Sequence, residues 1–297
     1  MAVHDADVLV VRTRTQVNEQ LLRGSKVQLV CTATIGYDHI DTAYCEAHGI
    51  RWMSCPGCNA QAVCDYIEEA LEEFQISNFK FQISNTPTIG VIGVGHVGSL
   101  VAQMAERKGY RVLLNDPPKG IGVSLDFSAS KGLDSYGFIA QNCDIITFHT
   151  PLTKEGTYPT YHLCDESFLS QCKPGALIIN AARGGVVDEQ ALLRSGHPYI
   201  LDTWENEPQI DVDVLAHAQL ASMHIAGYSE EGKRNATQMC LDAIADYFGL
   251  PKIRNHKSEI INRPLGDTAP GWLARISAQL KAHPEQFESL RKTYPLR

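Results

Sequence analysis

The feature that most constrains the fold of this chain is a glycine pattern, Gly93-Val-Gly95-His-Val-Gly98. The run at 88–94 is apolar and β-branched, which predicts a buried strand, and residues 97–108 place apolar side chains on one face of a helix. Between a strand and a helix, the first glycine permits a tight turn. The second lets the backbone approach a pyrophosphate, and the third lets helix and strand pack closely. The pattern therefore predicts a dinucleotide-binding α/β domain, the alternative being a tight turn that binds nothing.

The residues after this pattern indicate which dinucleotide is bound. The next predicted strand, 110–115, is followed by Asp116, which lies at about the 20-residue spacing expected of an acid that binds the ribose. A carboxylate there accepts a hydrogen bond from the 2′-hydroxyl group and repels a 2′-phosphate. The helix N-terminus offers free N–H groups and a positive dipole end to the phosphates. We therefore expect NAD rather than NADP.

Strands and helices alternate along most of the chain, which predicts an α/β fold with parallel sheets. Further strands are expected at 6–12, 27–33, 50–53, 144–148, 176–180, 199–203 and 223–226, and helices at 18–22, 41–48, 60–74, 167–171 and 233–248. Asp41 is the expected N-cap of its helix, and Gly49 its end. A repeat, Phe74–Asn78 and Phe81–Asn85, precedes Thr86-Pro87. We interpret it as a local duplication in a connector, with a hairpin as the alternative, and place a domain boundary there.

The charge balance excludes several classes of partner. With 34 acidic and 26 basic residues the net charge is −8, and no stretch is rich in Lys and Arg, so neither nucleic acid nor an anionic membrane is an expected partner. No apolar run approaches the ~18 residues of a membrane helix, and the first residues show no signal peptide. We expect a cytoplasmic protein.

The cysteines do not predict a metal site. Nine cysteines without a secretory signal are expected to be buried thiols. Cys55-Pro-Gly-Cys58 is the suggestive pair, with Cys64 nearby. A zinc site needs four ligands, and no second pair has this spacing. We interpret Pro-Gly as a turn, with a redox pair as the alternative, and expect no bound metal.

Three ionisable residues, Arg183, Glu207 and His224, come at or just after predicted strands. Ligands bind at the carboxyl ends of strands in open α/β sheets. A guanidinium group there can hold a carboxylate through two hydrogen bonds, and a histidine beside a carboxylate can exchange a proton with a hydroxyl group. Any one of these residues is often structural, but all three together favour oxidation of an alcohol next to a carboxylate, with hydride transfer to the dinucleotide.

Four segments carry a resemblance to a known family. They are Gly93-x-Gly95-x-x-Gly98, Ile178-Ile-Asn-Ala-Ala-Arg183-Gly, Trp204-x-x-Glu207-Pro208 and His224. Over about residues 6–248 the chain resembles the D-isomer-specific 2-hydroxyacid dehydrogenases. It is most similar to the members that act on 4-phospho-D-erythronate, in these segments: Pro56-Gly57-Cys58-Asn59-Ala60, Asp116-Pro117-Pro118, Phe148-His149-Thr150-Pro151-Leu152 and His224-Ile-Ala-Gly227-Tyr228-Ser-x-Glu-Gly232-Lys233.

The resemblance implies a fold and a reaction. The fold is a Rossmann-type doubly wound NAD domain with a smaller flavodoxin-like substrate domain. The reaction is NAD-dependent oxidation of 4-phospho-D-erythronate to its 2-oxo acid, within pyridoxal 5′-phosphate biosynthesis, by a homodimer. We expect the substrate domain at 1–85, the NAD domain at 86–228, and a helical dimerisation segment at 229–297 that completes the first domain.

The resemblance also implies residue roles. Arg183 holds the substrate carboxylate, His224 moves the proton and Glu207 orients the histidine. NAD contacts are implied at Gly93, Gly95, His96, Val97, Gly98, Asp116, Thr150, Ala181, Ala182, Asp202 and Gly227. Substrate contacts are implied at Thr13, Thr34 and Tyr228, and Arg12 and Arg14 are candidates for binding the phosphate.

Two segments depart from the family pattern. The resemblance implies a strand and a helix ahead of 6–12 that the printed sequence does not contain, and a longer stretch between Arg183 and Glu207. A shift of ~1 Å between Glu207 and His224 would lower the rate by about 10²-fold. Two alternatives stay open: a dehydrogenase for another D-2-hydroxy acid such as 3-phosphoglycerate, and an NAD-binding protein with impaired catalysis.

Overall fold

The computed structural model describes residues 3–77, 86–121, 135–253 and 271–295, which fall into two compact units. The first unit combines the described residues of 1–60 with those of 228–265. The second combines the described residues of 61–227 with those of 266–295. Both are built on parallel sheets, so the predicted α/β class is confirmed.

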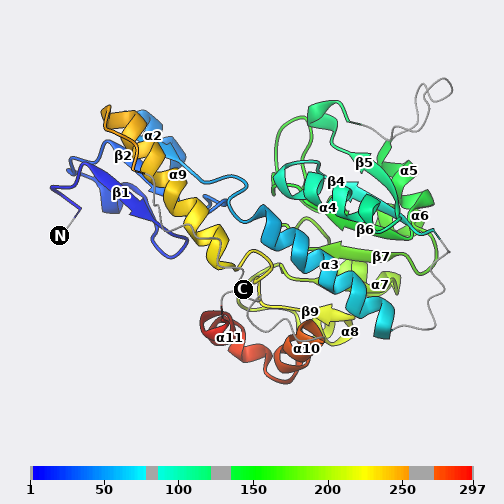
Figure 1. Cartoon of the computed structure of the whole chain (residues 1–297). Helices are drawn as coiled ribbons and strands as arrows, with labels where there is room; N and C mark the ends of the chain where they lie inside the picture. Colours follow the sequence, from blue (N-terminus) through cyan, green and yellow to red (C-terminus); the bar gives the residue numbers. More distant parts are fainter. Residues whose placement is uncertain (1–2, 78–85, 122–134, 254–270, 296–297) are drawn as a thin grey trace. The chain divides into compact units, whose positions relative to one another are not determined.

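The first unit is a three-stranded parallel sheet with helices on both faces (Figure 1). Its elements are β1 (Val8–Val11), α1 (Glu19–Leu22), β2 (Leu29–Thr32), α2 (Thr42–Ala47), β3 (Arg51–Met53) and α9 (Glu230–Phe248). Successive residues of β2 point to opposite faces, as a strand requires. Val30 packs with Leu22 and Cys45 on the face of α1 and α2, whereas Leu29 and Cys31 pack against α9.

The second unit is a six-stranded parallel sheet in the order β5-β4-β6-β7-β8-β9. Its strands are β4 (Thr88–Ile92), β5 (Arg111–Asn115), β6 (Ile145–Phe148), β7 (Leu177–Asn180), β8 (Tyr199–Leu201) and β9 (Leu220–Ala221). Its helices are α3 (Ala60–Ser77), α4 (His96–Arg107), α5 (Ser135–Asn142), α6 (Glu166–Gln171), α7 (Glu189–Ser195), α8 (Val212–His217), α10 (Trp272–Ala282) and α11 (Phe287–Thr293), with short 3₁₀ turns η1 (Pro117–Lys119) and η2 (Pro284–Gln286). Every residue of β4, β6 and β7 is buried, which explains why these strands are mostly apolar, each with a single polar residue.

The strand order places a binding crevice at the end of β4. This strand pairs with β5 on one side and β6 on the other. The connection after β4 runs to β5, whereas the connection after the neighbouring β6 runs the opposite way, to β7. Such a switch point opens a crevice at the carboxyl ends of the strands, where ligands of open α/β sheets bind. The loop after β4 contains the glycine pattern.

The compact units divide the chain differently from the expected domains. The helix at 60–77 packs with the second unit: Tyr66 Oη lies 2.8 Å from Ser222 Oγ. The Glu73 carboxylate accepts hydrogen bonds from the first N–H groups of α10, at Leu273 (2.9 Å) and Ala274 (2.7 Å). Of the expected 229–297 segment, α9 joins the first unit, whereas α10 and α11 belong to the second. The first copy of the repeat ends α3 through Ser77, and the second copy lies outside the described residues.

Most strands and helices begin and end within a few residues of the predicted positions, and one expected strand is wrong. Asp41 caps α2 as predicted by accepting the N–H of Tyr44 at 2.9 Å. The segment 223–226 is not a strand, because β9 ends at Ala221 and His224 has a φ of 58°. Four helices were not predicted: α5, α8, α10 and α11.

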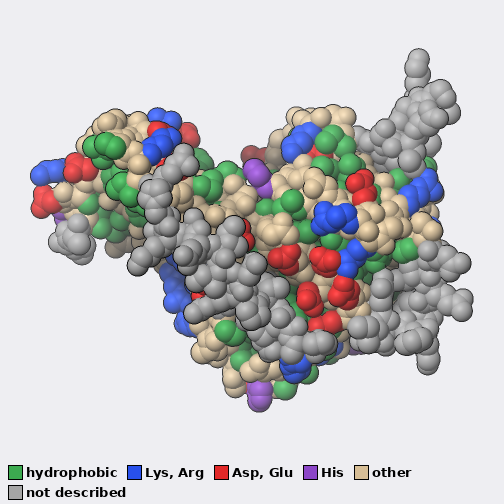
Figure 2. Space-filling view, viewed as in Figure 1, with side chains coloured by type: hydrophobic (Ala, Val, Ile, Leu, Met, Phe, Trp, Pro, Cys, Tyr) green, Lys and Arg blue, Asp and Glu red, His purple; other side chains and the backbone are tan. Residues whose placement is uncertain are grey.

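Charged side chains of both signs cover the exposed helices. Figure 2 shows acidic side chains gathered over α3 with basic ones among them. There Lys108 Nζ forms ion pairs with Glu72 and with Glu68, the latter at 2.9 Å. Among the described residues, no helix combines the length and the apolar character needed to cross a membrane.

Candidate active site

The glycine loop between β4 and α4 packs so closely against neighbouring backbone atoms that side chains cannot be accommodated at Gly93 and Gly98. Gly93 has a φ of 88°, and a Cβ atom on it would lie 2.8 Å from the carbonyl group of His149, at the end of β6. A Cβ on Gly98 would lie 1.9 Å from the Gly93 carbonyl oxygen. Nothing lies within 4 Å of a Cβ on Gly95. Of these three glycines, only Gly95 has open space beside it. That space lies at the start of α4, whose first residues are His96 and Val97, and it leaves room for a pyrophosphate.

Two side chains near this loop, those of Asp116 and Thr150, fit a bound dinucleotide. Asp116 follows β5, and its Oδ2 accepts the N–H of Val94 at 2.9 Å. Lys119 Nζ donates to the Val94 carbonyl at 2.7 Å and lies 3.9 Å from Asp116. Thr150 follows β6, and its hydroxyl oxygen is buried with no hydrogen-bond partner in the described structure. Since an unpaired buried hydroxyl costs about 1–3 kcal/mol, a ligand oxygen or nitrogen is the expected partner.

The turn after β7 presents Arg183. The Asn180 amide holds this turn, because its Nδ2 donates to the Arg183 carbonyl (2.9 Å) and its Oδ1 accepts the N–H of Ala182 (3.1 Å). Arg183 donates from its guanidinium group to the Ala182 carbonyl at 2.8 Å. Ala181 is buried between the strand and this turn. The half-buried guanidinium group thus lies at the carboxyl end of the sheet, as predicted.

His224 and Glu207 form the predicted pair. His224 Nδ1 lies 2.8 Å from Glu207 Oε2, and Glu207 Oε1 accepts the N–H of Trp204 at 2.9 Å. The short stretch after Arg183 therefore still brings the carboxylate to the histidine. Burial raises the pKa of Glu207, but hydrogen bonding to His224, the charge of His224, the Trp204 N–H and Arg291 outweigh it and hold that pKa below its ordinary value. Arg291, in α11, was missed because nothing near it in sequence resembles a site.

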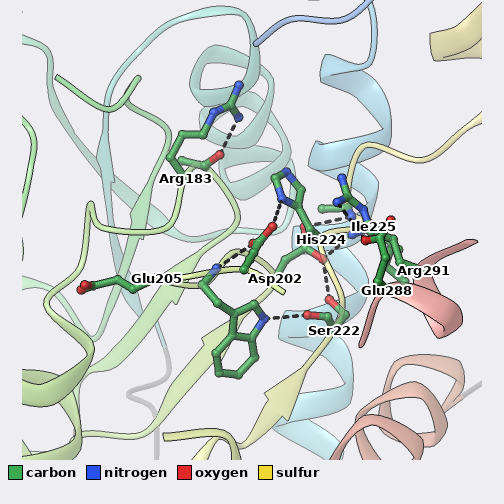
Figure 3. A network of polar contacts seen from close by, with 12 residues as sticks. Arg183, Asp202, Glu205, Ser222, His224, Ile225, Glu288 and Arg291 are labelled. Carbon is green, nitrogen blue, oxygen red and sulfur yellow. Dashed lines mark hydrogen bonds and ion pairs between the residues drawn. The ribbon is translucent and has the colours of Figure 1, made fainter. Parts of the chain in front are cut away.

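Asp202 explains why the segment around His224 is not a strand. Its carboxylate is buried and accepts hydrogen bonds from Ser222 Oγ (2.6 Å), Ile225 N–H (2.7 Å) and Ala226 N–H (3.0 Å). These bonds fold the chain around the carboxylate and turn His224 into the left-handed region, which non-glycine residues adopt mainly at constrained sites. Figure 3 shows Asp202 at the centre of this network, below the imidazole ring.

Comparison with known proteins identifies the family. The model of the D-isomer-specific 2-hydroxyacid dehydrogenase NAD-binding domain matches residues 64–234, more than half of the chain. The chain belongs to this dehydrogenase family. It is 44% identical to an erythronate-4-phosphate dehydrogenase of Bacteroides fragilis over 99% of this chain and 86% of the relative. It is 38% identical to the erythronate-4-phosphate dehydrogenase of Porphyromonas gingivalis, over 99% of this chain and 83% of that relative.

The solved structures agree on the fold. The NAD⁺-bound 3-phosphoglycerate dehydrogenase of Entamoeba histolytica superposes with a TM-score of 0.68 and 27% identity, covering 84% of this chain and 81% of that one. The present chain is therefore an NAD-dependent dehydrogenase with a Rossmann-type unit, and the predicted cofactor is confirmed.

The predicted substrate residues belong to the first unit of the dehydrogenase, apart from Arg183. Thr13 and Thr34 follow the carboxyl ends of the neighbouring parallel strands β1 and β2, so they come from the same edge of that sheet. Thr34 Oγ1 donates to the Gly36 carbonyl at 2.9 Å and lies 2.6 Å from Thr32 Oγ1. Tyr228 comes just before α9, and Gly227 is the last residue of the second unit ahead of it.

All nine cysteines of the dehydrogenase are free and buried, as predicted. Cys55 is close to Cys240 of α9, with 3.7 Å between the sulfur atoms, and also donates to the Ala236 carbonyl at 3.3 Å. Cys58 lies one turn away in the same core cluster. These thiols fill the space between the sheet of the first unit and α9, which is a packing role.

Proposed function

We propose that the chain oxidises 4-phospho-D-erythronate at C2 to the 2-oxo acid, with NAD as hydride acceptor. The observation that carries this proposal is the 2.8 Å contact between His224 and Glu207. NAD, when bound, accepts the hydride. The curated relatives from Bacteroides and Porphyromonas, which bear the name erythronate-4-phosphate dehydrogenase, support this substrate.

Each of the three residues has a separate role in the proposed reaction. Glu207 accepts a hydrogen bond from the N–H at Nδ1 of His224, which leaves Nε2 as the atom that takes the hydroxyl proton of the substrate. Arg183 binds the substrate carboxylate and sets which face of C2 the cofactor meets. As the hydride leaves C2 and the proton moves to His224, the alcohol becomes a ketone, and Glu207 stabilises the imidazolium that forms.

Besides Arg183, we assign substrate contacts to Thr13, Thr34 and Tyr228 of the first unit, and we assign cofactor binding to the second unit. Arg12 supports a phosphorylated substrate. The pKa of Lys233, in α9, is lowered by burial and by the nearby charge of Arg12. Two cations that repel each other favour an anion such as a phosphate beside them.

One assay tests the proposal. NADH formation is followed with 4-phospho-D-erythronate and with 3-phospho-D-glycerate, for the natural chain and for His224→Ala. We expect turnover with a preference for 4-phospho-D-erythronate, and loss of at least about 10²-fold in kcat for the variant. Preference for 3-phosphoglycerate would favour that substrate, to which the 27% identical Entamoeba structure points. NAD binding without turnover would favour the impaired protein, and full activity of His224→Ala would overturn the mechanism.

The remaining assignments follow from the family. We propose that the enzyme acts in pyridoxal 5′-phosphate biosynthesis in the cytoplasm, as a homodimer. Analytical sedimentation over the micromolar range tests the dimer. A monomer at every concentration measured would contradict it. Expression of this chain in a strain that lacks its own erythronate-4-phosphate dehydrogenase tests the pathway, because such a strain should then grow without added pyridoxine.

A further inference from the structure

A histidine outside the reacting set contacts both loops that carry the reaction. The N–H of His162 donates to the carbonyl of Gly185 at 2.7 Å, two residues beyond Arg183. Its ring Nε2 lies 2.9 Å from Oε1 of Glu205, two residues before Glu207. The backbone of this residue thus holds the Arg183 turn, and its side chain holds the Glu207 loop.

Several hydrogen bonds fix the loop at 204–207, which carries Glu207, on the side that faces His162. The N–H of Glu205 donates to Oε1 of Glu189 at 2.6 Å, and the Glu205 carboxylate accepts from His162. The preceding N–H, of Trp204, donates to Glu207. Figure 3 shows the Glu205 side chain pointing away from His224, so its carboxylate serves the opposite side of the loop from the catalytic pair.

The cluster of His162, Asp188 and Glu205 has the composition of a metal site but the wrong geometry. The two ring nitrogens face different carboxylates: Nε2 faces Glu205 at 2.9 Å, and Nδ1 faces Asp188 Oδ2 at 3.6 Å. The other oxygen of Asp188 caps α7 by accepting the N–H of Ala191 at 2.9 Å. Metal ligands converge on one point, whereas here the ring lies between the carboxylates. The ring hydrogen-bonds to one carboxylate, from Nε2 to Glu205 at 2.9 Å, and has the second carboxylate on its other side.

We propose that His162 is a positioning residue for the dehydrogenase reaction, acting through Glu205 to hold Glu207 against His224. This inference rests on the proposed catalytic roles of Glu207 and His224. Because a displacement of ~1 Å can cost about 10²-fold in rate, losing the His162 bond is expected to reduce turnover without touching NAD or substrate.

The test compares His162→Ala and His162→Gln, alone and combined with Glu207→Gln. We expect His162→Ala to lower kcat about tenfold with the KM for NAD within about twofold of the natural value. The amide of His162→Gln can still donate to Glu205 and should recover most of the rate. In the Glu207→Gln background, His162→Ala should cost less than about twofold, because the residue through which it acts is already impaired.

The matched control is His197→Ala. His197 is another half-buried histidine of the second unit, with its Nε2 3.2 Å from the Leu169 carbonyl. Three outcomes would each overturn the inference. They are an unchanged kcat for His162→Ala, a loss of kcat no greater than that of His197→Ala, and the same loss of kcat in the natural and the Glu207→Gln backgrounds. Absence of turnover by the natural chain would instead overturn the proposed function, and this inference with it, so the two failures are distinguishable.

Discussion

Gly184 lies directly against the carbonyl group of Trp204, and a Cβ atom on Gly184 would lie 1.8 Å from that oxygen. The contact joins the turn that carries Arg183 to the loop that carries Glu207. Backbone groups on both sides are held by hydrogen bonds, so neither can move aside as a flexible side chain would. The relative position of Arg183 and Glu207, to which we assign carboxylate binding and support of proton transfer, therefore depends on the absence of a side chain at Gly184.

Gly184→Ala is expected to lower kcat/KM by at least about 10²-fold, because the two loops must separate to admit the methyl group. The overpacking should also cost about 1–3 kcal/mol in the free energy of unfolding. Steady-state kinetics and urea unfolding measure the two effects. Gly137→Ala is the control, since a Cβ there meets only the Gln171 side chain at 3.4 Å. Equal behaviour of the two variants would contradict the prediction.

Gly95→Ala is expected to separate stability from cofactor binding. A Cβ on Gly95 meets nothing within 4 Å, and its φ of −80° suits alanine, so the melting temperature should stay unchanged. The methyl group would occupy the space that we assign to the pyrophosphate, and the KM for NAD should rise about tenfold or more. Calorimetry and NAD titration check both halves. A normal KM would place the phosphates elsewhere.

Asp116→Asn is expected to weaken discrimination against NADP. The amide oxygen can still accept the Val94 N–H, which now binds the carboxylate at 2.9 Å, while the charge that repels a 2′-phosphate is lost. The ratio of kcat/KM for NADP to that for NAD should rise about tenfold, as removing about 1.4 kcal/mol of repulsion predicts. Adding Lys119→Gln should reverse part of the gain, because Lys119 lies 3.9 Å from Asp116. A ratio that does not move would show that the charge of Asp116 does not select the cofactor.

The sequence predicted elements whose signal is local. The apolar runs of β4, β6 and β7, the glycine loop and the Asp41 cap each depend on neighbouring residues, and the chain folds there as expected. The positions of Arg183, Glu207 and His224 after predicted strands favoured carboxylate binding and proton transfer, and the family resemblance implied the same roles for them.

What could not be predicted depends on contacts between residues distant in sequence. Residues 223–226 have the composition of a strand, but Asp202, some twenty residues earlier, draws their N–H groups into a turn. The helix at 60–77 belongs with the NAD-binding unit because Glu73 caps α10, about 200 residues away. Arg291 and His162 contribute to the site only through such packing, and no spacing rule points to either.

Glu189→Gln is expected to change how stability depends on pH. Glu189 is 5% exposed, and burial raises its pKa from 4.5 to about 8, although the Glu205 N–H acts in the opposite direction. The folded chain therefore holds a proton on Glu189 that the unfolded chain releases, so its stability falls as pH rises from about 4.5 to about 8 and is level above that. Glutamine keeps the oxygen that accepts the Glu205 N–H and cannot ionise.

The free energy of unfolding of Glu189→Gln, relative to the natural chain, should thus grow across this window by a few kcal/mol. Urea unfolding at pH 5, 6.5 and 8 measures the difference. Glu166→Gln is the matched control, because Glu166 begins α6 as Glu189 begins α7 but its side chain is 82% exposed, and its difference should stay constant. A constant difference for Glu189→Gln as well would mean that the buried carboxyl group titrates normally, and that the support beneath the Glu207 loop carries a charge at neutral pH.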